Sequence, residues 1–178
     1  MKKLFLLIIG IVLMMPCAAQ DDGYVTMPDG SIRSSEQLLL SAEDMKIYLN
    51  SLSGEEKESV VNEIIAAFHM QVDQLNAMRG SDIFGNGMIF DGVEFNDQTR
   101  EVLFNCIFTE EINGQRYDLK DFVRDNNADQ NVAVFGEQYK QSFPPGYISA
   151  YEWLQIQFVF VIRGSLTNEV KRYSIPLY

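Results

Sequence analysis

Residues 88–109, "MIFDGVEFNDQTREVLFNCIFT", consist of two apolar segments on either side of the polar "NDQT". Alternating apolar residues on both sides of a polar turn predict a β-hairpin, with strands over about 88–95 and 100–109. The second strand carries apolar residues on both faces, with Val102, Phe104, Cys106 and Phe108 on one side and Leu103 and Ile107 on the other. This pattern is typical of an interior strand, or of one that is covered twice.

The segment before this hairpin predicts a long amphipathic helix from residue 55 to about Met78. Its apolar residues recur every three or four positions and form one stripe: Val60, Val61, Ile64, Ile65, Phe68, Val72 and Leu75. Ser53 and Glu56 have the spacing of a capping box at its start. Further upstream, Ser41 with Asp44 predicts the N-cap of a shorter helix.

The segment after the hairpin predicts more helix and then two more strands. Residues 118–142 predict two short helices or one kinked helix, because "DNNADQN" interrupts the apolar face. "FPPGY" predicts a turn, since proline disfavours helix at its own position and at the preceding one. Strands are expected at Tyr151–Ile162 and Val170–Leu177, and Pro176, which has no N–H, predicts a sheet edge for the last strand.

The order helix, helix, hairpin, helix, hairpin predicts an α+β fold, with the helices on one face of a mainly antiparallel sheet of about four strands. We expect a signal peptide over residues 1–19, an N-terminal arm or small hairpin over 20–34 and a single domain over 35–178. This shape resembles that of the cystatin-like inhibitors. Their Gln-x-Val-x-Gly motif aligns on Gln157 and Val159, but Val161 replaces the glycine, so the resemblance implies the sheet and no inhibitory motif.

The first 20 residues, "MKKLFLLIIGIVLMMPCAAQ", have the pattern of a bacterial export signal. Two lysines precede an apolar run from Leu4 to Met15, which is shorter than the ~20 residues that a membrane-spanning helix needs. Small side chains at Cys17 and Ala19 predict cleavage after Ala19 and a periplasmic or extracellular product. The alternative is a lipoprotein anchored through Cys17, although Pro16 stands where lipoprotein signals carry a small residue.

The chain is acidic, with 14 basic and 25 acidic residues and a net charge of −11. Such a chain repels phosphate backbones and anionic lipid surfaces, so we expect no nucleic-acid partner. No long apolar segment follows the signal, and we therefore expect no transmembrane helix in the mature chain.

Residues for nucleophilic or zinc chemistry are few. His69 is the sole histidine, and once Cys17 is removed Cys106 is the sole cysteine. A Cys106–His69 dyad is the one catalytic candidate, but the pattern favours a boundary histidine and a buried cysteine. One histidine and one cysteine do not supply a zinc ligand set, and no cofactor is predicted.

A calcium loop is the other metal candidate. Asp125, Asn127 and Asp129 occupy positions 1, 3 and 5 of an EF-hand pattern. Gln130 replaces the glycine expected at position 6, and Gly136 replaces the glutamate expected at position 12. The pattern therefore favours a solvated helix break.

The candidate binding surface is the alternating row Tyr151, Trp153, Gln155 and Gln157. Two aromatic rings and two amides on one strand face suit a protein or carbohydrate partner, unless the N-terminal arm or a second subunit covers them. The sequence thus favours an exported, non-catalytic binding or interaction module. The alternatives are a secreted hydrolase and a structural subunit that self-associates into a homo-oligomer.

Overall fold

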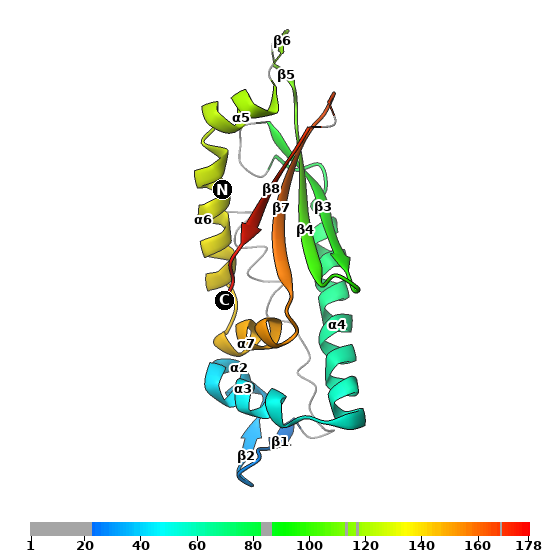
Figure 1. Cartoon of the computed structure of the whole chain (residues 1–178), viewed down its shortest axis with the longest axis vertical. Coiled ribbons are helices and arrows are strands. Elements are labelled where there is room, and N and C mark those ends of the chain that lie inside the picture. The colour runs from blue at the N-terminus through cyan, green and yellow to red at the C-terminus, as the bar shows by residue number, and fades with distance from the viewer. Residues whose placement is uncertain (1–22, 83–86, 113, 117, 168) are drawn as a thin grey trace.

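The computed structural model describes residues 23–82, 87–112, 114–116, 118–167 and 169–178. The predicted signal peptide, with Cys17, lies outside the described residues. The molecule is elongated, with a central sheet flanked by the long helices α4 and α6 (Figure 1). A smaller group of elements, β1, β2, α2 and α3, lies at one end beside α7.

The central sheet has four strands in the order β3-β4-β7-β8. They are β3 (Met88–Asn96), β4 (Glu101–Phe108), β7 (Gln157–Gly164) and β8 (Val170–Ile175). The two hairpins are antiparallel, which confirms the prediction from the opening stretch, and β4 is an interior strand as expected. The prediction from Pro176 that the last strand lies at an edge of the sheet is confirmed.

The two hairpins join through β4 and β7, and these strands run parallel. The sheet is therefore mixed, and the expectation of a mainly antiparallel, cystatin-like sheet is wrong. The physical reason is the connection between the two strands. A parallel pair needs a crossover of a dozen or more residues, and helices α5 (Leu119–Asp125), α6 (Ala128–Gln141) and α7 (Pro145–Trp153) supply one.

The long helices pack on the same face of this sheet. The ring of Phe68 in α4 (Gly54–Asn76) lies 5.9 Å from that of Phe158 in β7, and the ring of Tyr139 in α6 lies 5.7 Å from it. Phe122 of α5 stacks 4.3 Å from Phe108 at the end of β4. The core thus lies between one helical layer and one sheet layer.

The opposite face of the sheet carries a narrow apolar centre. Val159 and Val161 are 8% and 6% exposed, so this centre is not an open apolar patch. Two ion pairs lie across the same face, Arg172 with Glu101 at 3.1 Å and Arg163 with Asp91 at 3.7 Å.

The predicted strand at Tyr151–Ile162 is wrong in its first half, because residues 145–153 form helix α7. Pro145 lies in the first turn, where the missing N–H costs nothing. Tyr147, Ala150, Tyr151 and Leu154 also have helical spacing and are buried. Gln155 has a left-handed φ of 57° and joins the helix to β7.

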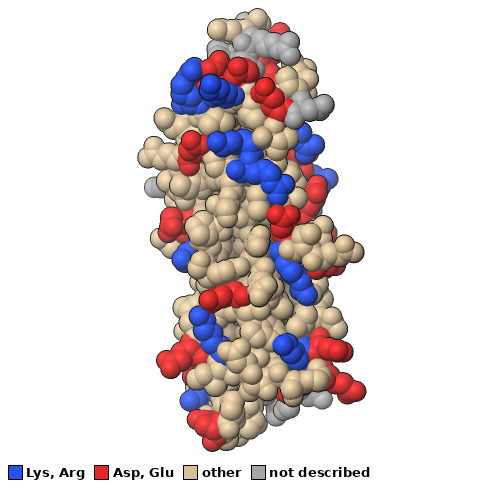
Figure 2. Space-filling model, viewed as in Figure 1, with Lys and Arg blue, Asp and Glu red and all other residues tan. Residues whose placement is uncertain are grey.

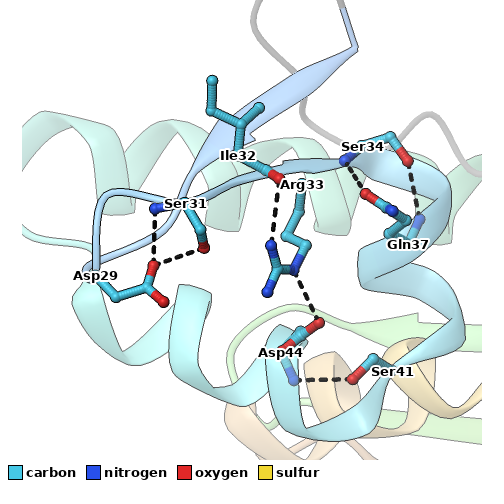
Figure 3. Close-up of polar contacts among 8 residues, drawn as sticks. All are labelled: Asp29, Ser31, Ile32, Arg33, Ser34, Gln37, Ser41 and Asp44. Atoms are coloured by element: carbon cyan, nitrogen blue, oxygen red, sulfur yellow. Dashed lines mark hydrogen bonds and ion pairs between the residues drawn. The ribbon is translucent and has the colours of Figure 1, made fainter.

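The N-terminal elements are β1 (Tyr24–Thr26), β2 (Ile32–Ser34), α2 (Ser35–Leu40) and α3 (Ala42–Ser51). Asp29 closes the β1–β2 turn by accepting hydrogen bonds from the N–H and hydroxyl of Ser31, at 2.8 and 2.6 Å (Figure 3). Arg33 reaches across to Asp44 at 3.3 Å. The Arg33–Asp44 ion pair ties the hairpin to α3.

Helix caps in this region follow the sequence closely, with one exception. The Ser41 hydroxyl accepts a hydrogen bond from the Asp44 N–H at 3.1 Å, which confirms the predicted N-cap of α3 (Figure 3). Ser34 and Gln37 form a reciprocal capping box at α2. Ser53 is the N-cap residue of α4, but its side chain makes no cap hydrogen bond, so the predicted box with Glu56 does not form.

The remaining described elements are the short strands β5 (Glu111–Ile112) and β6 (Gln115–Arg116), which form a two-stranded sheet beyond β4. Within the described ranges, no helix combines the length and the apolar character needed to cross a bilayer.

Candidate functional site

The two edges of the central sheet differ in what lies against them. At β3, the Gly80 N–H donates to the Phe90 carbonyl and the Phe90 N–H donates to Ser81, both at 2.8 Å. The Asn76 side chain accepts from the Val93 N–H at 2.7 Å and donates to its carbonyl at 3.0 Å. The chain's own α4–β3 connection therefore occupies this edge, which is a common protection against edge-to-edge pairing.

The edge at β8 has outward-facing backbone groups. Gly164 donates to the Glu169 carbonyl, so these residues form a hydrogen-bonded pair at the start of the β7–β8 ladder. Hydrogen-bonded and non-hydrogen-bonded residue pairs alternate along an antiparallel ladder, and the backbone groups of the non-hydrogen-bonded pairs point away from the partner strand. The N–H and C=O groups of Arg172 and Ser174 therefore point away from β7, and no described residue bonds them.

Two hollows lie along this edge, between β8 and the helices (Figure 1 shows β8 beside α6). The first, of about 430 Å³, is lined by Leu119, Lys120, Val123, Glu169, Val170 and Lys171. The second, of about 180 Å³, is lined by α6 and by residues 173–176 of the last strand. Both hollows lie beside β8, and we refer to the pair as the β8 groove.

Charge differs between the two ends of the β8 groove. The first hollow contains Lys120 and Lys171, and the second contains Asp129 and Glu137. On the face shown in Figure 2, Lys and Arg side chains lie among Asp and Glu side chains. The β8 groove thus has a basic end and an acidic end.

Tyr173 contributes a buried hydroxyl to the second hollow. No described atom meets hydrogen-bond geometry with this hydroxyl, and its side chain also lines the hollow. Burial raises the pKa of Tyr173 well above its ordinary value, and the nearby Asp129 carboxylate raises it further. The hydroxyl therefore stays protonated and lies beside the Asp129 carboxylate.

A buried glutamate fixes the turn that leads into β8. Glu110 is fully buried, and its carboxylate accepts hydrogen bonds from the Leu166 N–H and, at 2.5 Å, from the Thr167 hydroxyl. Its own N–H donates to the Ser165 hydroxyl at 3.1 Å. The glycine at 164 allows the carboxylate to approach the backbone. Glu110 thereby positions the hairpin that presents the β8 edge.

The sequence pattern contained a signal for this glutamate. The buried row of β4 consists of every second residue of the strand and ends at Phe108. Glu110 is the next position in the same alternation. The adjacent Glu111 is out of phase with this row and is exposed. A carboxylate in phase with a buried row indicates instead that hydrogen-bond donors surround it.

The structure does not bring His69 and Cys106 together. His69 is bonded to Asp97 at 2.9 Å and its ring lies 5.3 Å from that of Phe95. Phe95 pairs with Val102, and Cys106 lies four residues further along β4, which is roughly 13 Å at the usual strand rise. The two residues thus have no shared reaction site.

Cys106 is expected to be chemically inert in the folded protein. Its side chain is 1% exposed, and burial, with a smaller effect from Asp91, raises the pKa of its thiol far above the usual range. We predict that a thiol reagent such as a disulfide dye labels Cys106 only after denaturant is added. Rapid labelling of the native protein, followed by absorbance, would contradict the burial seen here.

The three calcium candidates do not form a cation cage. Asp125 binds Arg124 at 2.7 Å, and Asn127 has a left-handed φ of 48° at the start of α6. Asp129 lies in the first turn of α6 and faces Tyr173. In the described part of the chain, no group of three or more His, Cys, Asp or Glu residues has metal-site geometry.

The four predicted binding residues do not share a strand face. Tyr151 is fully buried in α7, with its ring 5.3 Å from Phe68. Trp153 ends α7 beneath the Lys57 ammonium, which lies 5.3 Å from its ring centre. Gln155 and Gln157 are exposed in the joint and at the start of β7. Because the four residues lie in a helix, a turn and the start of a strand, their side chains are separated. Binding of a partner by any of the four remains a prediction.

Comparison with known proteins gives no match to a family model, a curated protein or a solved structure.

Proposed function

We propose that this chain is an exported, non-catalytic interaction module that binds an extended segment of a partner protein along the outer edge of β8. The observation that carries the proposal is the contrast between the two sheet edges. The β3 edge is occupied at Phe90 and Val93, whereas the outward groups of Arg172 and Ser174 meet no described partner.

Strand addition is a common way of recognising an extended peptide. Backbone hydrogen bonds supply affinity, and pockets for alternate side chains supply specificity. The β8 groove has both features, because two hollows lie beside the strand that offers the free groups. Pro176 has no N–H, so the pairing is expected to end at Ser174.

Two further observations support a non-catalytic, exported module. Cys106 is buried on the helix-covered face and lies away from His69, so the dyad that a secreted hydrolase would use is not assembled. The export part of the proposal depends on the signal-like pattern of residues 1–19.

The proposal is tested with one substitution at the free edge. Peptides of about ten residues, a full strand length, are selected from a random display library on the purified protein and then synthesised. Ser174→Pro removes the outward N–H but no bond to β7. We predict that it weakens peptide binding about tenfold or more, since a lost hydrogen bond is worth about 1 kcal/mol and the ring obstructs the edge. Fluorescence anisotropy measures the affinity.

Ser174→Ala is the matched control, because it keeps the N–H and changes an exposed side chain. It should bind the peptides as the wild type does. If Ser174→Pro lowers the thermal stability, N-methylation of alternate peptide residues removes the same hydrogen bonds from the ligand side. Equal binding of the methylated and unmethylated peptides, or selection of no peptide, overturns the proposal. Dimerisation through β8, seen by light scattering and lost in Ser174→Pro, would favour a self-associating subunit instead.

A further inference from the structure

Lys120 and Lys171 are cations that line the first hollow without a carboxylate partner among the described residues. Lys120 is exposed at the start of α5. Lys171 is exposed on β8, and its ammonium lies 5.3 Å from the ring centre of Tyr173. In a chain with a net charge of −11, two such cations in one hollow indicate attraction for an anion.

The third charged group in this hollow is already engaged. The Glu169 carboxylate accepts a hydrogen bond from the Leu119 N–H at 3.1 Å and thus faces the start of α5. It reduces the positive charge of the hollow without pairing with either lysine. The hollow keeps an excess of cationic groups beside the apolar side chains of Val123 and Val170.

The second hollow has the opposite character. Asp129 and Glu137 contribute carboxylates, and the Tyr173 hydroxyl lies beside the Asp129 carboxylate. Along the strand, the first hollow is lined by residues 169–171 and the second by residues 173–176, so the two lie about four positions apart, which corresponds to roughly 13 Å. Side chains four positions apart on an added strand lie on the same face.

We propose that the bound segment is bipolar, with an acidic side chain beside Lys120 and Lys171 and a basic side chain four positions away, beside Asp129 and Glu137. This inference rests on strand addition at β8 and specifies the chemistry of the partner. Complementary charges of this kind select one direction and register for a strand whose backbone bonds alone would allow several.

The first test is the composition of the selected peptides. We expect an Asp or Glu and a Lys or Arg four positions apart in the enriched sequences. Replacing the acidic residue of a selected peptide by its amide should weaken binding about twofold to fivefold, the range for exposed ion pairs. Enrichment without this charge pattern overturns the bipolar inference.

The second test reverses the charges on the protein. Lys120→Glu and Lys171→Glu should each weaken the acidic peptide about threefold to tenfold, with the effect falling at high salt. A peptide with lysine in place of its acidic residue should then bind Lys171→Glu better than it binds the wild type. Lys140→Glu is the matched control, because it makes the same charge change on α6 and lines neither hollow.

The outcomes separate the two proposals. If Ser174→Pro abolishes binding while Lys120→Glu and Lys171→Glu behave like Lys140→Glu, strand addition is supported and the bipolar segment is wrong. If inorganic phosphate competes with the peptide only in proteins that keep both lysines, the anion preference of the first hollow is supported directly. If none of these variants differs from the wild type, both proposals fail.

Discussion

Glu110→Ala is expected to destabilise the protein by about 3 kcal/mol, because it leaves the donors of the β7–β8 turn without their acceptor. Glu110 is fully buried and receives hydrogen bonds from the Leu166 N–H and the Thr167 hydroxyl. Removal of the carboxylate also opens a void where the turn approaches Gly164. Urea denaturation followed by circular dichroism gives the change in unfolding free energy.

A graded series makes this prediction specific. In Glu110→Gln the amide oxygen still accepts from Leu166, and the Thr167 hydroxyl can rotate to accept from the amide nitrogen. We therefore expect a loss of about 1 kcal/mol. Glu111→Gln, at the adjacent exposed position, should change stability by less than about 0.5 kcal/mol. Equal stability of Glu110→Ala and Glu111→Gln would contradict the buried position of Glu110.

The loss at Glu110 should extend to the proposed function. The turn fixes how β8 pairs with β7, and the outward groups of Arg172 and Ser174 depend on that pairing. Hydrogen exchange at the β8 amides should accelerate in Glu110→Ala more than exchange in β4 does, because the hairpin is freed at one end only.

Gly146→Ala is the second substitution with a large expected effect. Gly146 lies in α7 against the backbone of α2, where an added Cβ would overlap the Leu38 carbonyl oxygen and lie 2.8 Å from the Leu39 Cα. Such overpacking typically costs up to about 3 kcal/mol, and backbone atoms cannot move aside as a side chain can. Alanine recovers about 1 kcal/mol of helix propensity. We expect a net loss of about 2 kcal/mol and a melting temperature lower by roughly 4–8 °C.

Gly136→Ala is the matched control for this prediction. It makes the same change in α6, where the added Cβ would lie 2.9 Å from the Cγ2 methyl of Ile175. A side-chain methyl can shift, and the gain in helix propensity offsets part of the cost, so we expect a change within about 1 kcal/mol. If calorimetry shows the same melting temperature for both variants, the close approach of α7 to α2 is absent in solution.

The elements predicted correctly are those whose signal is local. The β3–β4 hairpin and helix α4 have apolar residues at spacings that only one type of element satisfies. Pro176 placed the last strand at an edge because its missing N–H excludes a central position. Ser41 capped α3 because its hydroxyl reaches an N–H three residues away.

The predictions that are wrong concern a segment whose apolar residues fit both a helix and a strand, and two strands that pair although they are far apart in the sequence. Residues 147–158 satisfy both the alternation of a strand and the spacing of a helix. The contacts of Tyr151 with Phe68 and Phe158 decide in favour of the helix. The predicted row Tyr151, Trp153, Gln155 and Gln157 assumed a strand throughout, whereas Tyr151 and Trp153 lie in helix α7.

Local sequence patterns were sufficient to predict an α+β fold, an interior strand β4, a long amphipathic helix and a sheet edge at Pro176. The parallel pairing of β4 with β7, the burial of Glu110 and the hollows beside β8 became visible only in the folded molecule. The physical reason is the range of the interactions. Helix and hairpin patterns arise between residues a few positions apart, whereas the paired residues of β4 and β7 are more than 50 positions apart in the sequence. That pairing is set by burial of a shared core.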